Sequence, residues 1–127
     1  MKPLCFIIMP FGKKTHARGN IIDFDYVYNE FIRKVIEKCN FSPIRADEEM
    51  IGGIIHKPMY ERLILCDYAI ADLTTANANV FFELGIRYTA KPYTTFSIFE
   101  YDKKIPFDLV DVRSFPYSIT DGIIKDL

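Results

Sequence analysis

The sequence predicts an α/β domain with a mostly parallel sheet, because short apolar runs alternate with amphipathic segments along the chain. The runs at residues 4–9 and 68–72 are almost wholly apolar, which is typical of strands buried on both faces. Polar turns follow these runs, as expected where strands leave a sheet. The chain has 127 residues, of which 50% are hydrophobic, so we expect one domain with one core.

Five strands are predicted, at residues 4–9, 41–46, 68–72, 94–99 and 115–119. The fourth is rich in β-branched and aromatic residues, and the fifth is a weaker example of the same pattern. Since helical segments separate the strands, we expect right-handed crossovers and a five-stranded, mostly parallel sheet.

Helices are predicted at residues 25–39, 58–65 and 80–88, with a short closing helix from about residue 120. In the first, Val27, Phe31 and Val35 recur at helical spacing, and Pro58 suits the first turn of the second. We expect the side-chain oxygen of Asn79 to cap the third. Helices on both faces of an open parallel sheet define a flavodoxin-like fold, in which ligands bind beyond the carboxyl ends of the strands.

The densest group of polar residues follows the strand at 68–72 and consists of Asp72, Asn77, Asn79 and Glu83. Asn79 and Glu83 are four residues apart and share a helical face, so we expect the four side chains to converge. Apolar neighbours of Glu83 predict a partly desolvated carboxyl with a raised pKa. Paired carboxylates are typical of glycosidic bond cleavage. The alternatives are that Glu83 is exposed near the helix start and that Asp72 only forms the turn.

Two other turns offer ligand contacts. The turn after the first strand contains Gly12 and a basic cluster (Lys13, Lys14, His16 and Arg18) that could close over an anion, or form a solvated loop. It has neither a Walker A nor a Rossmann glycine pattern. Arg45 and Asp47 flank the end of the second strand, where either could bind a ribose or a phosphate. His56 is a candidate base or a capping residue.

Composition narrows the classes of ligand and compartment. The net charge of −1 and the scattered basic residues argue against duplex nucleic acid as a partner. Neither the three cysteines nor the acidic residues 47–49 follow a metal-site spacing, so no metal and no cofactor are predicted. The widely spaced cysteines fit a reducing, cytoplasmic compartment. No segment resembles a signal peptide or is long enough to span a membrane.

Three segments carry a family resemblance: CFIIMPFG, then IRADEE with GGIIHKPMYERL, and above all CDYAIADLTTANANVFFELGIRY. The chain resembles, over most of its length, the nucleoside 2-deoxyribosyltransferase-like and TIR-like superfamily. It is most similar to bacterial deoxyribosyltransferase-like modules related to the region near the TRAF-binding domain of apoptosis signal-regulating kinases. These modules belong to larger signalling proteins, and the related transferases form homo-oligomers.

The resemblance implies that Glu83 attacks the anomeric carbon and that Asp72 contacts the base or sugar. The first-strand loop (Met9, Pro10, Phe11 and Gly12) would border the sugar pocket. The turn before Glu83 carries Asn77 and Asn79 in place of the family's small and hydroxyl residues. A nucleotide or NAD is therefore as well matched a ligand as a nucleoside. Candidate phosphate partners are Lys13, Arg45, Arg62 and Arg87.

The sequence leaves two functions open: a nucleotide N-glycosidase that uses Glu83, and a catalytically silent domain that senses a nucleotide or binds a protein. A response-regulator receiver is disfavoured, because its first strand ends in acidic residues that hold Mg²⁺. Here that strand ends in Met9, Pro10 and Phe11.

Overall fold

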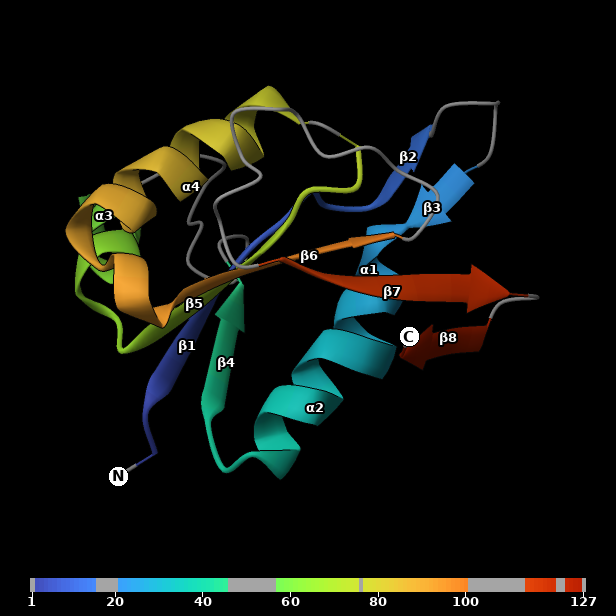
Figure 1. The fold of residues 1–127 in the computed structure, drawn as a ribbon, viewed down its shortest axis with the longest axis horizontal. Helices are drawn as coiled ribbons and strands as arrows, with labels where there is room; N and C mark the ends of the chain where they lie inside the picture. Colours follow the sequence, from blue (N-terminus) through green and yellow to red (C-terminus); the bar gives the residue numbers. More distant parts are fainter. Residues whose placement is uncertain are drawn as a thin grey trace.

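A computed structural model describes residues 2–15, 21–45, 57–75, 77–100, 114–120 and 123–126. Its main sheet has the strand order β4-β1-β5-β6-β7-β8. The first five strands of this order are parallel, and β8 is antiparallel to β7. The bounds are β1 Leu4–Ile8, β4 Ser42–Arg45, β5 Tyr68–Asp72, β6 Thr95–Glu100, β7 Ser114–Thr120 and β8 Ile123–Asp126. Counted along the chain, the parallel strands have the order 2-1-3-4-5, so the predicted flavodoxin-like fold is confirmed (Figure 1).

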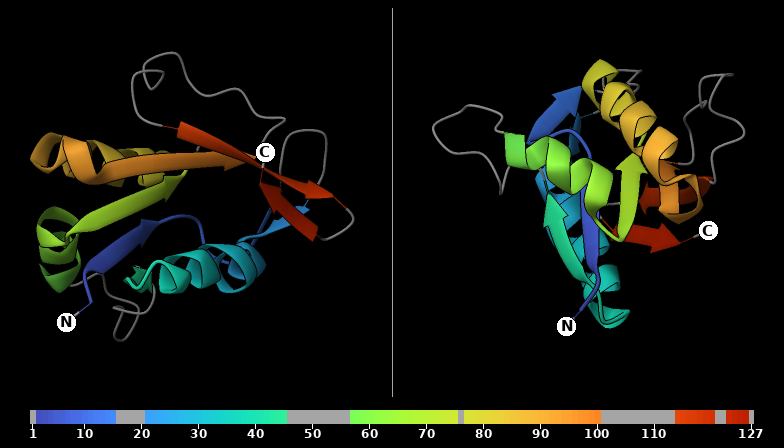
Figure 2. Two further views of the ribbon diagram at one scale, coloured as in Figure 1. Left: turned by 60° about the horizontal axis from the view of Figure 1, so that its bottom comes forward. Right: turned by 90° about the vertical axis from the view of Figure 1, so that its left-hand side faces the viewer.

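Helices pack on both faces of the sheet (Figure 2). One face is covered by a continuous helical segment made of α1 Phe24–Val27, the π-helical stretch η2 Tyr28–Ile32 and α2 Arg33–Lys38. The other is covered by α3 Lys57–Leu65 and α4 Ala78–Ala90, after which the short 3-10 helix η4 Pro92–Thr94 leads into β6.

The central strand β1 contributes to both halves of the core. Phe6 and Ile8 pack with residues of α3 and α4, whereas Cys5 and Ile7 pack with residues of α1 to α2. Side chains of a strand alternate between its faces, so a strand buried on both sides is apolar at every position. This is why the run at residues 4–9 predicted β1 so directly.

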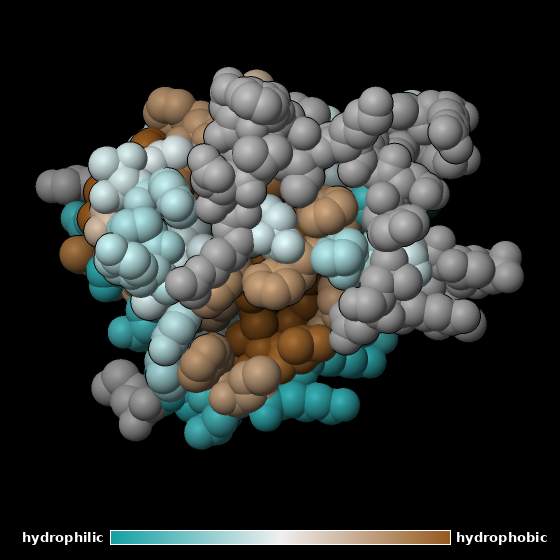
Figure 3. Space-filling view, viewed as in Figure 1, coloured by the Kyte–Doolittle hydropathy of each residue, from teal (hydrophilic) through white to brown (hydrophobic). Residues whose placement is uncertain are grey.

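The layer formed by α1 to α2 leaves an apolar hollow beside it. On the face seen in Figure 3, apolar side chains gather in a depression between α2 and β4, below β6 and β7. The depression has a volume of about 140 Å³, and its lining includes Val35 and Ile36 of α2 and Phe96 of β6.

The end of the chain departs from prediction. We expected a short helix from about residue 120, but Ile123–Asp126 forms β8, in which Ile123 pairs with Thr120 of β7. Two residues, Asp121 and Gly122, separate this pair in the sequence, and Asp-Gly between β-branched residues is a strong hairpin signal. The predicted helix was therefore wrong, because the last residues pair with the edge strand β7 as a hairpin partner.

A second, unpredicted pairing follows the first strand. The strands β2 Lys13–Thr15 and β3 Ile21–Asp23 form an antiparallel ribbon, with Lys13 opposite Asp23. Gly12 has a φ of +68°, a left-handed conformation that glycine adopts without steric strain, and it redirects the chain from the sheet into this ribbon. Part of what the sequence suggested to be a loop is therefore regular structure.

Candidate functional site

The turn between β5 and α4 is shaped by hydrogen bonds from its own side chains. Asp72 Oδ1 accepts a hydrogen bond from the backbone N–H of Thr74, at 3.0 Å, which folds the chain back as it leaves β5. The side-chain oxygen of Asn77 accepts hydrogen bonds from the backbone N–H groups of Asn79 (2.9 Å) and Val80 (3.1 Å). Asn77 is therefore the N-cap of α4, and the prediction that Asn79 caps this helix was wrong.

Asn79 instead contacts the candidate nucleophile. Its Nδ2 donates a hydrogen bond to Glu83 Oε1 at 2.8 Å, as the shared helical face predicted. Glu83 lies on the buried side of α4 and is only 5% exposed. Burial raises the pKa of the Glu83 carboxyl, against the lowering effect of the bond from Asn79. The result is a partly desolvated carboxyl that is held by one amide.

Asp72 lies in a different group of contacts. It is 1% exposed, Tyr117 Oη of β7 donates to its Oδ2 at 2.7 Å, and Thr74 Oγ1 donates to its Oδ1. Thr74 Oγ1 in turn accepts a hydrogen bond from the backbone N–H of Glu100, at 3.1 Å. Burial raises the pKa of Asp72 to about 6, against the lowering effect of the bonds from Thr74 and Tyr117. This cluster ties together the carboxyl ends of β5 and β6 and the side of β7.

The two carboxyls are therefore held separately. Asp72 is two residues from Ile70 in β5, so the two side chains lie on the same face of the sheet. Ile70 packs in the core half beneath α1 to α2, and Tyr117, the partner of Asp72, belongs to that same half. Glu83 belongs to α4, which covers the opposite face. Sequence reasoning did not identify Tyr117, because 45 residues separate it from Asp72 and no local pattern links them.

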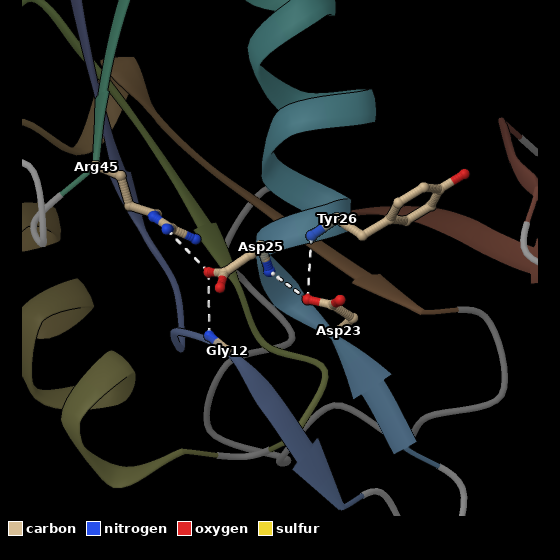
Figure 4. A network of polar contacts seen from close by, with 5 residues as sticks. All are labelled: Gly12, Asp23, Asp25, Tyr26 and Arg45. Carbon is tan, nitrogen blue, oxygen red and sulfur yellow. Dashed lines mark hydrogen bonds and ion pairs between the residues drawn. The ribbon is translucent and has the colours of Figure 1, made fainter.

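The first-strand loop is fixed by the start of α1 (Figure 4). The backbone N–H of Gly12 donates to Asp25 Oδ1 at 3.1 Å, and Arg45 Nη2 forms an ion pair with the same oxygen at 2.9 Å. The bond from Gly12 and the guanidinium of Arg45 lower the pKa of Asp25. Asp23 caps α1 by accepting from the backbone N–H groups of Asp25 and Tyr26. Sequence reasoning missed Asp25, because no local pattern links it to Gly12 or Arg45. Asp23 was also missed, although an aspartate just before a helix is a signal for an N-cap.

Arg45 is enclosed rather than extended towards solvent. Its guanidinium carbon lies 5.1 Å from the ring centre of Phe11 and 4.7 Å from that of Tyr28, and the residue is 6% exposed. Cation–π contacts with these rings and the ion pair with Asp25 hold the end of β4 against the first-strand loop. Of the other loop residues predicted to border a pocket, Met9 and Pro10 are buried, and Met9 packs in the core.

The remaining candidates lie elsewhere. Lys13 is exposed in β2 and Arg62 is exposed in α3. Arg87 is fully buried, and its guanidinium donates to backbone oxygens of Leu63, Cys66 and Asp67, at the amino end of the sheet. Asp47, His56 and the acidic residues 47–49 lie outside the described residues. Within the described ranges, no three His, Cys, Asp or Glu side chains are grouped as metal ligands, and no helix is long and apolar enough to cross a membrane.

Comparison with known proteins returned no matching family model, no matching curated protein and no matching solved structure.

Proposed function

We propose that this domain binds a nucleoside, a nucleotide or NAD beyond the carboxyl ends of its parallel strands and cleaves the N-glycosidic bond with Glu83 as the nucleophile. The observation that carries this proposal is the Glu83–Asn79 pair. A carboxyl is held on the buried side of a helix at the ligand-binding end of an open sheet, with one amide bound to one of its oxygens. Partial desolvation makes such a carboxylate more reactive than one in water.

The proposed reaction has two steps. Glu83 Oε attacks C1′ of the sugar, and the electron pair of the C1′–N bond leaves with the base. Nicotinamide leaves NAD as a neutral molecule and needs no proton, whereas a purine or pyrimidine base leaves as an anion and takes up a proton from water. The resulting glycosyl ester is then attacked at C1′ by water, or by the nitrogen of an acceptor base. This attack breaks the ester bond, restores the Glu83 carboxylate and releases the sugar or a new nucleoside.

Asp72 has a supporting role in this proposal. Its two oxygens are occupied by Tyr117 and Thr74, and it lies on the side of the sheet opposite α4. We assign it to positioning the turn that leads to Asn77 and α4, and not to proton transfer. The mechanism therefore depends on one carboxylate rather than a pair.

The test is an assay in which the protein is incubated with NAD, nucleoside monophosphates and deoxynucleosides, and the release of free base is measured by chromatography. We expect the unmodified protein to release base from at least one of them and Glu83→Gln to lose at least 100-fold of that activity. Glu61→Gln is the matched control, because Glu61 is exposed on α3. Turnover retained by Glu83→Gln would exclude Glu83 as the nucleophile.

A second function is favoured by one observation: Glu83 is only 5% exposed, which limits the approach of a sugar carbon. In this alternative the domain senses a nucleotide without turnover. It predicts that one of the compounds above raises the melting temperature while no base is released.

A further inference from the structure

Ser97 is a buried polar residue that the proposed mechanism does not use. It lies in the middle of β6 and is 0% exposed. Within the described part of the chain, its Oγ atom makes no hydrogen bond. A buried hydroxyl without a partner costs stability, and an alanine at the same position would avoid that cost. The hydroxyl therefore indicates a partner that it meets in another state of the site.

The side chain of Ser97 faces α4. Its neighbours Phe96 and Ile98 lie on the α2 side of the sheet, where Phe96 lines the apolar hollow, and side chains alternate between the two faces along a strand. Ser97 also pairs in register with Ala71 of β5, which packs in the core half beneath α3 and α4. Because the side chain of Ala71 ends at Cβ, it adds little bulk beside the Ser97 hydroxyl.

Glu83 is the residue of α4 that lies at the level of Ser97. One turn further along the helix, Arg87 Nε donates to Thr95 Oγ1 at 3.0 Å, and this bond fixes the alignment of α4 on β6. The helix runs against the strand direction, because it begins after the carboxyl end of β5 and leads back to the start of β6. Glu83 precedes Arg87 by about 6 Å along the helix axis. Ser97 follows Thr95 by about 7 Å along the strand, so Glu83 and Ser97 form the next facing pair.

The carboxyl of Glu83 has an oxygen available for this hydroxyl. Asn79 Nδ2 donates to Oε1, and none of the described residues donates to Oε2. When the carboxyl is protonated, its proton is on Oε2, because Oε1 accepts the bond from Asn79. Ionisation turns Oε2 into a charged acceptor, and a hydrogen bond to a charged oxygen is roughly twice as strong as a neutral one.

We infer that Ser97 Oγ is a second donor to Glu83 and that it binds Oε2 when the carboxyl is ionised. Rotation about χ1 of Ser97 and about the broad terminal torsion of Glu83 brings the two atoms together. With one donor on each oxygen, the carboxylate is held in the orientation in which it attacks C1′, and it is stabilised when it leaves C1′ in the second step. Ser97 is thus a positioning residue. Its role in catalysis rests on the proposed function, whereas the hydrogen bond itself does not.

The neighbouring charges do not take the place of this donor. The described charged side chains on the elements packed around Glu83 are those of Glu61, Arg62, Asp72, Arg87 and Glu100. The first two are exposed on α3, and the guanidinium of Arg87 donates at the amino end of the sheet. Asp72 lies on the face opposite α4, and Glu100 is three residues from Ser97 in β6 and therefore lies on that opposite face as well.

The test is the pKa of Glu83, measured from the pH dependence of its ¹³C carboxyl signal in protein labelled at glutamate. The signal is identified by its absence from Glu83→Gln. We expect Ser97→Ala to raise this pKa, because the substitution removes a donor to the charged form. Ser42→Ala is the matched control, since it removes a hydroxyl from the edge strand β4, which β1 and β5 separate from β6. It should leave the pKa of Glu83 unchanged.

Stability and activity give two further readouts. Ser97→Ala should lower the free energy of unfolding at a pH above the pKa of Glu83 but not below it, and this pH dependence should be absent in a Glu83→Gln background. In base release, Ser97→Ala should move the acidic limb of kcat/KM to higher pH, with about a tenfold loss of kcat/KM on that limb.

The inference is overturned if Ser97→Ala leaves the pKa of Glu83 unchanged. It is also overturned if the substitution lowers this pKa, since the hydroxyl would then bind the protonated carboxyl. A raised pKa without base release by any variant supports the hydrogen bond and contradicts the proposed function. Base release that requires Glu83, with a pKa that Ser97→Ala does not move, supports the proposed function and contradicts this inference.

Discussion

Helix α4 buries two side chains of opposite charge one turn apart, and the two differ in how many hydrogen bonds they make. Glu83 and Arg87 have the spacing of a helical ion pair. Arg87 instead donates from Nε and both Nη atoms to Thr95 Oγ1, Thr94 Oγ1 and the backbone oxygens of Leu63, Cys66 and Asp67. Among the residues that the structure describes, one donates a hydrogen bond to the Glu83 carboxyl, namely Asn79.

This difference separates a structural charge from a candidate reactive one. At the amino end of the sheet, Arg87 joins the last turn of α3 to the starts of β5 and β6, so its hydrogen bonds compensate its desolvation. Near the carboxyl end, the carboxyl of Glu83 is desolvated with little compensation, and its pKa is raised. Proteins tolerate such under-compensated groups chiefly where they do chemistry.

The largest expected effect is that of Arg87→Met, which retains bulk but removes the guanidinium. Three backbone oxygens and two threonine hydroxyls lose their donor in a buried site, so we expect a loss of about 3–5 kcal/mol in the free energy of unfolding. Urea unfolding measures it. Arg87→Lys is the informative companion, because it keeps the charge but lacks the planar fork, and it should recover less than half of the loss.

At the other end of the comparison, Glu83→Gln should stabilise the protein slightly at pH 7. Because the pKa of Glu83 is raised in the folded protein, the stability that protonated Glu83 contributes is lost as pH rises through that pKa. The glutamine side chain carries no charge but still offers an acceptor to Asn79. We expect a gain of up to about 1 kcal/mol, measured by the same urea titration. A marked loss instead would mean that the Glu83 charge is compensated like that of Arg87.

Asp72 provides a second buried carboxyl whose pH dependence can be worked out. The pKa of Asp72 is about 6 in the folded protein and 3.8 ordinarily. Below pH 4 the group is protonated in both states. Between pH 4 and 6 only the folded state holds the proton, so the stability contributed by the protonated form falls as pH rises through this window.

A shift of this size corresponds to about 3 kcal/mol between pH 4 and 7. We therefore expect unfolding titrations of the unmodified protein to show a fall in stability of about this size between pH 4 and 7. Asp72→Asn cannot take up the proton, so its stability should not show this fall. Parallel curves for the two proteins would show that the hydrogen bonds from Thr74 and Tyr117 fully compensate the ionised carboxylate.

Glu83 and Arg87 also illustrate what the sequence could predict, because the partner of Glu83 is near in the sequence and the partners of Arg87 include distant residues. β1 and β5 were predicted within a residue, because strands buried on both faces are apolar at every position. The contact between Asn79 and Glu83 was predictable because it follows from helical spacing alone. Both features depend on neighbours within a few residues.

Long-range partners were not predictable. Tyr117 contacts Asp72 across 45 residues, and Arg87 contacts Leu63 across 24. Arg87 was considered as a phosphate partner on residue type alone, whereas its role depends on where α3 ends and β6 begins. The choice between Asn77 and Asn79 as the cap also needed backbone geometry, since both are asparagine and asparagine caps helices well.

The two asparagines give a smaller and more local prediction. Asn77→Ala removes the acceptor for two backbone N–H groups at the start of α4 and should cost about 1 kcal/mol in the free energy of unfolding. Asn77→Ser, which can still cap the helix, should restore most of it. An equal loss for Asn77→Ser would show that the turn needs the asparagine itself rather than a cap.

Asn79→Ala should cost up to about 1 kcal/mol at pH 7, because the residue is exposed and caps nothing but donates to the buried Glu83 carboxylate. Its effect should appear in the pH dependence of base release. The bond from Asn79 lowers the pKa of Glu83, so its removal raises that pKa further and moves the acidic limb of kcat/KM to higher pH. A lower rate with an unmoved limb would mean that Asn79 contacts the ligand and does not tune Glu83. An unmoved limb with an unchanged rate would place the reactive carboxylate elsewhere, and Glu83 would then be a buried charge that α4 tolerates without using.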